Sequence, residues 1–444
     1  MKSFQFAIVT VTTSLVLLKR AACEFDPKSH NNVIHYWGQN SASMAGNDPD
    51  HTLWQKPLAE YCDREELDMM VISFLHKFGE GRLTSFDIAN SGKDCAGFFP
   101  GTELLNCPQM ESDIKYCQGK GKKILLSLGG ATPEYGLDSI ESGQSFADEL
   151  WNTFGAGQHE HRPFGNAVVD GFDLDIENGA KAGYPAFINR MREHYSKDTS
   201  KQYFIAGAPQ CPYPDYYLGE ALDNAWFDFV MIQFYNNYCN VINGPQFNYN
   251  TWDEWARTKS INKDIRLFVG IPGSPSAAGR GYVPYEQLVS TIKPLQQLMT
   301  FGGIMVWDVS QAYGNTIDVL PSYAHGIAQL IHSSNNTLET VLAPESTTIA
   351  TLNTVSQSPA TTAVVMTTTV SPAETISPET NTVDTVTSRP NEIRHGKPCL
   401  ENGILKCSGE SSYGQCTNGY WVVRNCPVVT VCKENNNSIF CGFP

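Results

Sequence analysis

The chain has few charged residues, and basic residues are the scarcer kind. Only 17% of its 444 residues are charged, and 46 acidic residues against 31 basic ones give a formal net charge of −15. A surface of this sign repels polyanions, so we expect neither nucleic acid nor an anionic membrane surface as a partner. A neutral polymer such as a polysaccharide is compatible with this charge.

Long apolar runs are also lacking, apart from one at the N-terminus. Residues 4–18 are apolar, but the run is too short for a convincing membrane span and two basic residues follow it directly. Small residues come next, so we expect a signal peptide over 1–23, with an N-terminal anchor as the alternative. The chain is therefore predicted to be secreted, without a membrane span, and extracellular or associated with a cell wall.

No CxxC pair, the spacing typical of structural zinc sites, occurs among the 13 cysteines. Cys23 lies at the expected cleavage site, and without it the others form two even sets. Even sets in an exported chain indicate disulfides rather than metal ligands. The first set lies in the large N-terminal region, at Cys62, Cys95, Cys107, Cys117, Cys211 and Cys239. The second is crowded near the C-terminus, at Cys399, Cys407, Cys416, Cys426, Cys432 and Cys441.

Aromatic residues are absent from a segment rich in Thr, Ser and Pro over 335–392. Such a composition cannot bury a core, and in a secreted protein it indicates an O-glycosylated linker. The linker divides the chain into a large domain over 24–334 and a small cysteine-rich module over 393–444. Asn335 and Asn436 begin N-x-S/T sequons and are candidate N-glycosylation sites.

Apolar runs typical of β-strands recur through the large domain, with helical or loop segments between them. Eight are found, at 33–38, 68–75, 122–130, 171–177, 203–210, 227–235, 265–273 and 302–310. Strands that alternate with crossover segments are typical of parallel β/α units, and eight of them predict a closed (β/α)8 TIM barrel of the α/β class. A doubly wound open sheet is the alternative, but no GxGxxG or P-loop motif supports it.

The run DGFDLDIE at 170–177 is the sharpest local feature. Side chains alternate between the two faces of a strand, so Asp173, Asp175 and Glu177 share one face and the apolar residues share the other. In a barrel the apolar face packs against the helices, which leaves three carboxyl groups pointing inward. Buried like charges are costly, and the fourth of eight barrel strands has no solvated edge. Catalysis explains this arrangement better than a solvated strand edge does.

Close carboxyl groups raise one another's pKa, so one of them can retain a proton near neutral pH. Glu177 is nearest to the C-terminal end of the strand, where barrel active sites open, and is the expected proton donor. Asp175 lies one step deeper and can pivot between its neighbours and a substrate group, while Asp173 can tune both. Asp170 is out of register, and we expect a structural role for it. The histidines are scattered without a Ser or Cys partner motif, which argues against a catalytic triad.

These motifs carry a resemblance to a known family. DGFDLDIE resembles the DxxDxDxE signature of glycoside hydrolase family 18, and KILLSLGG at 123–130 resembles the SxGG strand of that family. VIHYWGQN, MIQFYNNYC and GGIMVWDVS extend the resemblance over about residues 31–334 and make it specific to the plant and fungal class III chitinases. The resemblance implies a retaining chitinase that acts on chitin and chito-oligosaccharides. We expect it to be a monomer that needs no cofactor and no metal.

The resemblance also implies catalytic roles. Glu177 would act first as general acid and then as base, and the N-acetyl carbonyl oxygen of the substrate would be the nucleophile. Asp175, with Asp173 below it, would stabilise the acetamido group, and Tyr235 would orient the attacking carbonyl. Trp307 would form the floor on which a sugar ring stacks, with packing in the barrel core as the alternative.

Four polar residues are expected either to contact the substrate or to make ordinary loop hydrogen bonds. They are Gln233, Asn236, Gln39 and Asn40. The class III resemblance further implies that Cys62 pairs with Cys117, Cys95 with Cys107, and Cys211 with Cys239.

The C-terminal module resembles the family 19 chitin-binding module. A domain this small cannot form an adequate core, so disulfides would stabilise it. Tyr420 and Trp421 are the expected chitin contacts, and a structural or protein-binding knot is the alternative. An endo-β-N-acetylglucosaminidase acting on N-glycans and a chitin-binding lectin without activity are the alternatives to a chitinase.

Overall fold

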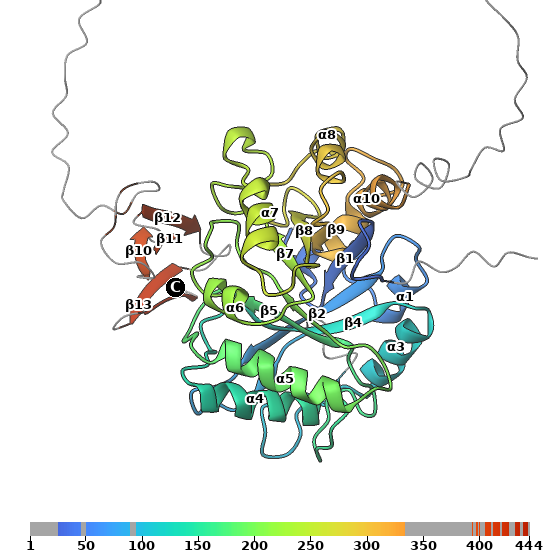
Figure 1. Ribbon diagram of the computed structural model, residues 1–444, viewed down its shortest axis with the longest axis vertical. Coiled ribbons are helices and arrows are strands. Elements are labelled where there is room, and N and C mark those ends of the chain that lie inside the picture. Colours follow the sequence, from blue (N-terminus) through green and yellow to red (C-terminus); the bar gives the residue numbers. More distant parts are fainter. Residues whose placement is uncertain are drawn as a thin grey trace, which may run out of the picture.

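The computed structural model describes residues 25–45, 50–88 and 95–333, together with parts of the segment from 393 to 442 (Figure 1). The parts described in that segment are 393, 397, 399, 405–409, 412–417, 420–425, 431–435 and 438–442. The expected signal peptide, the linker, and the sequons at Asn335 and Asn436 lie outside the described residues.

Eight parallel strands form a closed barrel, which confirms the predicted TIM-barrel fold. They are β1 (Asn32–Trp37), β2 (Met69–Lys77), β4 (Lys123–Gly130), β5 (Gly171–Ile176), β6 (Phe204–Gly207), β7 (Phe229–Gln233), β8 (Arg266–Pro272) and β9 (Phe301–Trp307). The order β1-β9-β8-β7-β6-β5-β4-β2 closes because β1 also pairs with β2, and this closure rules out the open sheet. A short strand that was not predicted, β3 (Ser85–Phe86), pairs antiparallel with β2.

Helices follow the strands and cover the outside of the barrel (Figure 1). They are α1 (Leu58–Cys62), α3 (Pro108–Gly119), α4 (Ile140–Thr153), α5 (Tyr184–Lys197), α6 (Gly219–Asn224), α7 (Tyr249–Thr258), α8 (Tyr285–Leu295), α9 (Val309–Gly314) and α10 (Tyr323–His332). Short 3-10 helices occupy Ser41–Ala45 (η1) and Gly244–Gln246 (η2). No helix in the described ranges combines the length and the apolar character that crossing a bilayer requires.

The barrel has two apolar layers, one between strands and helices and one inside the ring of strands. In β5 the apolar residues Phe172, Leu174 and Ile176 belong to the outer layer, as the alternation predicts. The inner layer takes residues from all barrel strands except β5. They include Ile34, Met69, Leu125, Phe204, Met231, Phe268 and Met305. Strand β5 alone contributes no apolar residue to it, because its inward positions are the buried Asp173 and Asp175.

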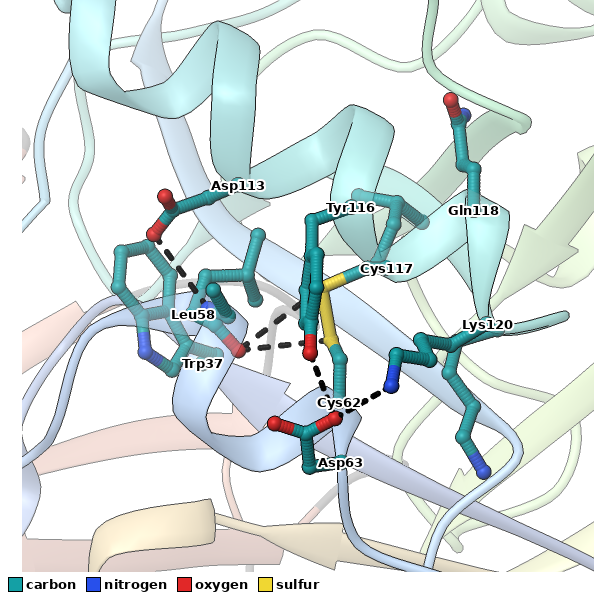
Figure 2. Close-up of a disulfide and its surroundings, with 12 residues drawn as sticks. Trp37, Leu58, Cys62, Asp63, Asp113, Tyr116, Cys117, Gln118 and Lys120 are labelled. Carbon is teal, nitrogen blue, oxygen red and sulfur yellow. Dashed lines mark hydrogen bonds and ion pairs between the residues drawn. A yellow bond between two sulfur atoms is a disulfide. The ribbon is translucent and has the colours of Figure 1, made fainter.

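The disulfide between Cys62 and Cys117 fastens α1 to α3 (Figure 2). Next to it, Asp63 accepts a hydrogen bond from the Tyr116 hydroxyl at 2.7 Å and forms an ion pair with Lys120 at 2.8 Å. Both sulfur atoms are fully buried, so the covalent link lies within the helix–helix contact rather than on the surface. The pairing is the one that the family resemblance implies.

The other two disulfides of the barrel domain also follow the implied pairing. Cys95 pairs with Cys107 in the segment between β3 and α3. Cys211 pairs with Cys239 and joins the loop after β6 to the loop after β7. Because both of these loops start at the carboxyl ends of barrel strands, the last disulfide fixes part of the face where barrel active sites form.

The C-terminal module consists of small antiparallel sheets. Strands β10 (Leu405–Gly409), β11 (Ser412–Thr417) and β12 (Tyr420–Asn425) form one sheet, and β13 (Val431–Asn435) pairs with β14 (Ser438–Gly442). A disulfide between Cys407 and Cys432 joins β10 to β13. This covalent link supports a module whose apolar core is too small to stabilise it alone.

Candidate active site

A cavity of about 530 Å³ opens at the carboxyl ends of the barrel strands. Its lining includes Asp175 and Glu177 at the end of β5, Gln233 and Tyr235 at the end of β7, and Trp307 at the end of β9. The structure therefore brings together at one cavity these five side chains from three strand ends, which span 132 positions of the sequence from Asp175 to Trp307. This is the end of a TIM barrel at which active sites form.

Asp173 lies deepest in the acidic ladder and is fully buried. Its Oδ2 accepts hydrogen bonds from the hydroxyls of Tyr36 and Ser127, both at 2.6 Å. Burial raises the pKa of Asp173 to about 6, although the two hydroxyl donors oppose the shift. Asp173 can therefore bind or release a proton close to neutral pH.

Asp175 lies one pleat above Asp173, with 5% of its surface exposed. Burial raises its pKa well above the ordinary value, and the charges of Glu177, Asp173 and Asp215 raise it further. The Gln233 amide donates to its Oδ1 at 2.7 Å, which favours the ionised form and fixes the orientation of the carboxyl group. One of the two carboxyl oxygens of Asp175 is thereby bonded within the protein, and the residue lines the cavity.

Glu177 follows the last residue of β5 and is half-buried at the cavity wall. Its backbone N–H donates to the Tyr135 hydroxyl at 2.8 Å, and that hydroxyl donates in turn to the Gly130 carbonyl at 2.6 Å. The Gln210 amide donates to Glu177 Oε2 at 3.1 Å. Both the backbone and the carboxyl group of Glu177 are therefore held in position from neighbouring loops.

The SxGG sequence of β4 packs directly against the ladder. Ser127 supplies one of the hydroxyls bonded to Asp173. At Gly129, which has a φ of +107°, an added Cβ would lie 2.3 Å from the Asp175 carbonyl oxygen. Only glycine permits both this conformation and this approach, so the motif sets the spacing between β4 and the carboxyl-bearing strand.

Tyr235 is buried beside the ladder, with 6% of its surface exposed. Burial raises its pKa well above the ordinary value, and the charges of Asp175, Glu177 and Asp173 add to the shift. Its hydroxyl therefore keeps its proton and can donate a hydrogen bond into the cavity. The loop after β8 supports it from behind, where an added Cβ at Gly281 would lie 2.8 Å from Tyr235 Cα.

Trp307 is half-buried and lines the cavity, where it also packs against other aromatic rings. It stacks on Phe74 with ring centroids 5.7 Å apart and meets Tyr36 edge-on at 5.6 Å. An indole that is supported by rings on its sides and faces a cavity can stack on the apolar face of a sugar.

The other four polar residues expected at the site have different environments. Gln233 and Asn236 line the cavity. Gln39 and Asn40 are not among the described residues that line it. Gln39 donates to the carbonyls of Ser73 and Asp87, and Asn40 exchanges hydrogen bonds with Gln55. Contact of Gln39 and Asn40 with the substrate stays a prediction.

Several residues of the site were not predicted from the sequence. Phe74, Gln210, Asn237 and Arg280 line the cavity, and Asp215 is buried in the same loop after β6 that carries Gln210. The sequence around Asp215 indicates a local role for it in a turn. An Asp in a turn commonly accepts backbone N–H groups a few positions on, and Asp215 accepts those of residues 217 and 218.

Burial raises the pKa of Asp215 to about 6, although three backbone N–H donors oppose the shift. The charge of Glu177 adds to it. The site therefore contains a fourth carboxyl group that interacts electrostatically with the ladder, although it comes from a different loop.

Comparison with known proteins gives two family matches. The model described as "Glycosyl hydrolases family 18" matches residues 32–278, and "Carbohydrate binding domain (family 19)" matches residues 379–436. "Chitinase 2" of Rhizopus oligosporus is 41% identical over 417 residues, which are 93% of this chain and 70% of that protein.

Solved structures of two kinds resemble the barrel. A chitinase from Ipomoea carnea has 31% identity and a TM-score of 0.54, over 68% of this chain and 100% of its own. A xylanase and alpha-amylase inhibitor protein from Scadoxus multiflorus has 32% identity and a TM-score of 0.53, over 69% of this chain and 99% of its own. The same barrel therefore occurs both in a protein named as a chitinase and in a protein named as an inhibitor.

Proposed function

This chain belongs to glycosyl hydrolase family 18, and we propose that it is a secreted chitinase that hydrolyses β-1,4-N-acetylglucosamine linkages of chitin and chito-oligosaccharides. One observation carries the proposal. Asp173, Asp175 and Glu177 form a ladder from the barrel interior to a cavity that Tyr235 and Trp307 also line. The barrel fold does not require three carboxyl groups on the inward face of a strand. Glycoside hydrolysis does need carboxyl groups, as acids and bases.

In the first step, Glu177 donates a proton to the oxygen of the glycosidic bond as the bond to the anomeric carbon breaks. The N-acetyl carbonyl oxygen of the same sugar attacks that carbon from the opposite face and forms an oxazolinium-type intermediate. Asp175 accepts a hydrogen bond from the acetamido N–H and stabilises the positive charge. Its position supports this role, because Asp175 lines the cavity and Gln233 holds one oxygen of its carboxyl group.

Tyr235 donates its hydroxyl hydrogen bond to the attacking carbonyl oxygen and so orients it. A tyrosine can do this only while protonated, and the raised pKa of Tyr235 keeps it so. In the second step, Glu177 as base removes a proton from a water molecule, which attacks the anomeric carbon and opens the ring of the intermediate. Two inversions at one carbon give net retention of the β configuration.

Asp173 adjusts the charge of the ladder. When Asp175 is ionised beside the acetamido group, a proton on Asp173 removes a neighbouring negative charge. The pKa of about 6 makes that proton available near neutral pH, and the hydroxyls of Tyr36 and Ser127 can bond either form of the carboxyl group.

The C-terminal module would keep the enzyme on insoluble chitin. Support comes from the family 19 match over 379–436 and from Trp421, which is half-buried on β12. A tryptophan on a small cross-linked sheet can stack on sugar rings of a polysaccharide surface. The side chain of Tyr420, the other expected contact, lies outside the described residues.

The test compares wild type with Glu177→Gln, which keeps the size of the side chain and removes the acid. The two proteins are assayed for soluble oligosaccharides released from chitin and for binding to chitin. We expect the variant to bind but to lose about 10²- to 10⁴-fold in rate, the contribution of a general acid or base. Glu134→Gln, at an exposed position in the loop after β4, is the matched control and should stay active.

Two results would contradict the proposal. A wild type that binds chitin and releases nothing would be a lectin. A wild type that releases glycans from a glycoprotein but no oligosaccharides from chitin would be an endo-β-N-acetylglucosaminidase.

A further inference from the structure

We propose that Gln210 is a positioning residue that sets which oxygen of Glu177 carries the transferable proton, and that Asn237 sets the orientation of the Gln210 amide. The inference rests on the proposed function, because it assigns a role relative to an acid. It concerns two residues outside the acidic ladder, on the loops that follow β6 and β7.

The backbone of Gln210 is held on several sides. Gln210 forms an isolated parallel bridge with Gln233 of β7, and the next residue, Cys211, is disulfide-bonded to Cys239. The Gln210 N–H also donates to Asp215 Oδ2 at 3.1 Å. A residue anchored by a bridge, a neighbouring disulfide and a buried carboxyl group presents its side chain from a fixed origin.

The side-chain amide of Gln210 is oriented by a second amide. Asn237 Nδ2 donates to Gln210 Oε1 at 3.2 Å, and Gln210 Nε2 donates to Glu177 Oε2 at 3.1 Å. An NH₂ group only donates and an amide oxygen only accepts. As long as Asn237 donates, the NH₂ group of Gln210 must therefore face Glu177.

A carboxyl oxygen that carries a proton is a poorer acceptor than its partner oxygen. The Gln210 bond therefore favours Oε2 as the unprotonated oxygen and Oε1 as the one that holds the proton. General acid catalysis depends on the direction of the O–H bond relative to the leaving oxygen, and misplacement by about 1 Å can cost about 10²-fold in rate. The pair Asn237 and Gln210 supplies that direction from outside the ladder.

This role has a signature that general structural damage lacks. Proton donation matters when the leaving group is a sugar hydroxyl, and it matters little when the leaving group is a dinitrophenolate, which departs without a proton. Loss of acid positioning should therefore slow natural substrates and spare activated ones. The value of kcat/KM is the proper readout, because it reports the steps up to departure of the leaving group and not the later attack by water.

The experiment measures kcat/KM of wild type, Gln210→Leu and Asn237→Asp on chito-oligosaccharides and on the dinitrophenyl glycoside of chitobiose. Gln210→Leu removes the donor. Asn237→Asp replaces a donor by an acceptor, so the Gln210 amide should turn and present its oxygen to Glu177. We expect both variants to lose about 10²-fold on the oligosaccharides and little on the activated glycoside.

Gln246→Leu is the matched control, because this exposed amide lies on the β7–α7 loop and its Oε1 accepts from Asn243. It should match wild type on both substrates. Equal losses on both substrates in Gln210→Leu and Asn237→Asp would show a structural role, and no loss on either would show no role; both results overturn the inference. A wild type inactive on both substrates would overturn the proposed function instead, and the inference would fall with it.

Discussion

His35 in β1 provides a test of the electrostatics of the barrel wall. The side chain is completely buried, and neither ring nitrogen has a hydrogen-bond partner among the described residues. Its nearest aromatic neighbour is Tyr313, with ring centroids 5.8 Å apart. Burial alone lowers the pKa of His35 to about 3, because the imidazolium ion would lose its hydration without gaining a partner.

The direction of the effect on stability follows from this pKa. The folded chain keeps His35 neutral, whereas the unfolded chain protonates it below its ordinary pKa of 6.5. The contribution of neutral His35 to the free energy of unfolding is therefore fully present above pH 6.5 and is lost as the pH falls toward 3. With these two pKa values, the loss relative to pH 8 is about 2 kcal/mol at pH 5 and about 3 kcal/mol at pH 4.

Wild-type stability will not show this loss directly, because buried carboxyl groups act in the opposite direction. Asp173 and Asp215 have pKa values raised to about 6, so the folded chain gains stability as the pH falls through 6. The difference in unfolding free energy between wild type and His35→Leu removes these shared contributions. Urea unfolding at pH 8, 5 and 4 measures it, and the same substitution at the exposed His51 is the control.

Between pH 8 and pH 4 we expect the free energy of unfolding of His35→Leu to rise by about 3 kcal/mol relative to that of wild type. Any effect of repacking adds an offset that does not change with pH. The reasoning fails if the difference between the two proteins stays constant over that range. It also fails if His51→Leu shows the same gain, because an exposed imidazole loses little hydration on folding.

Three further predictions concern the site, the disulfides and the module. Tyr235→Phe should lower kcat on chito-oligosaccharides by about 10²-fold with little change in KM, because the lost hydrogen bond strengthens in the transition state; steady-state kinetics will measure both. Replacing Cys62 and Cys117 together by Ala should cost up to about 4 kcal/mol of unfolding free energy, since the link closes a loop of 55 residues; a urea titration that shows no loss would contradict this. Trp421→Ala should weaken binding to insoluble chitin and leave hydrolysis of soluble oligosaccharides unchanged, and equal effects in the two assays would refute a separate binding role.

The fold and the ladder could be predicted from the sequence because both depend on short-range periodicity. Alternation along 171–177 assigns each side chain to one of two faces, and the structure confirms the assignment. The family resemblance is confirmed as well, over residues 32–278 for the barrel.

Gln39 and Asn40 show how a turn after a strand affects the side chains that follow it. Both follow β1 at the catalytic end of the barrel, yet the backbone turns between them and the strand. Gly38 has a φ of +131° and Asn40 a φ of +46°. At this turn Gln39 donates to the carbonyls of Ser73 in β2 and of Asp87, and Asn40 exchanges hydrogen bonds with Gln55. A sequence shows that a turn is present, but the direction in which it sends the next side chain depends on the tertiary contacts that select the turn.

Asp215 and Gln210 show the same limit for long-range contacts, and they bear on the chemistry. Asp215 lies 40 positions from Asp175 in the sequence, and no periodicity connects them, yet its charge helps to raise the pKa of Asp175. Asp173 and Asp215 both have pKa values near 6, one from the barrel interior and one from the loop after β6. Protonation of either group removes a negative charge that acts on Asp175. In the proposed mechanism, the ionisation of Asp175, and with it the stabilisation of the acetamido group, therefore depends on two separate structural elements, and a sequence pattern connects only the members of the ladder.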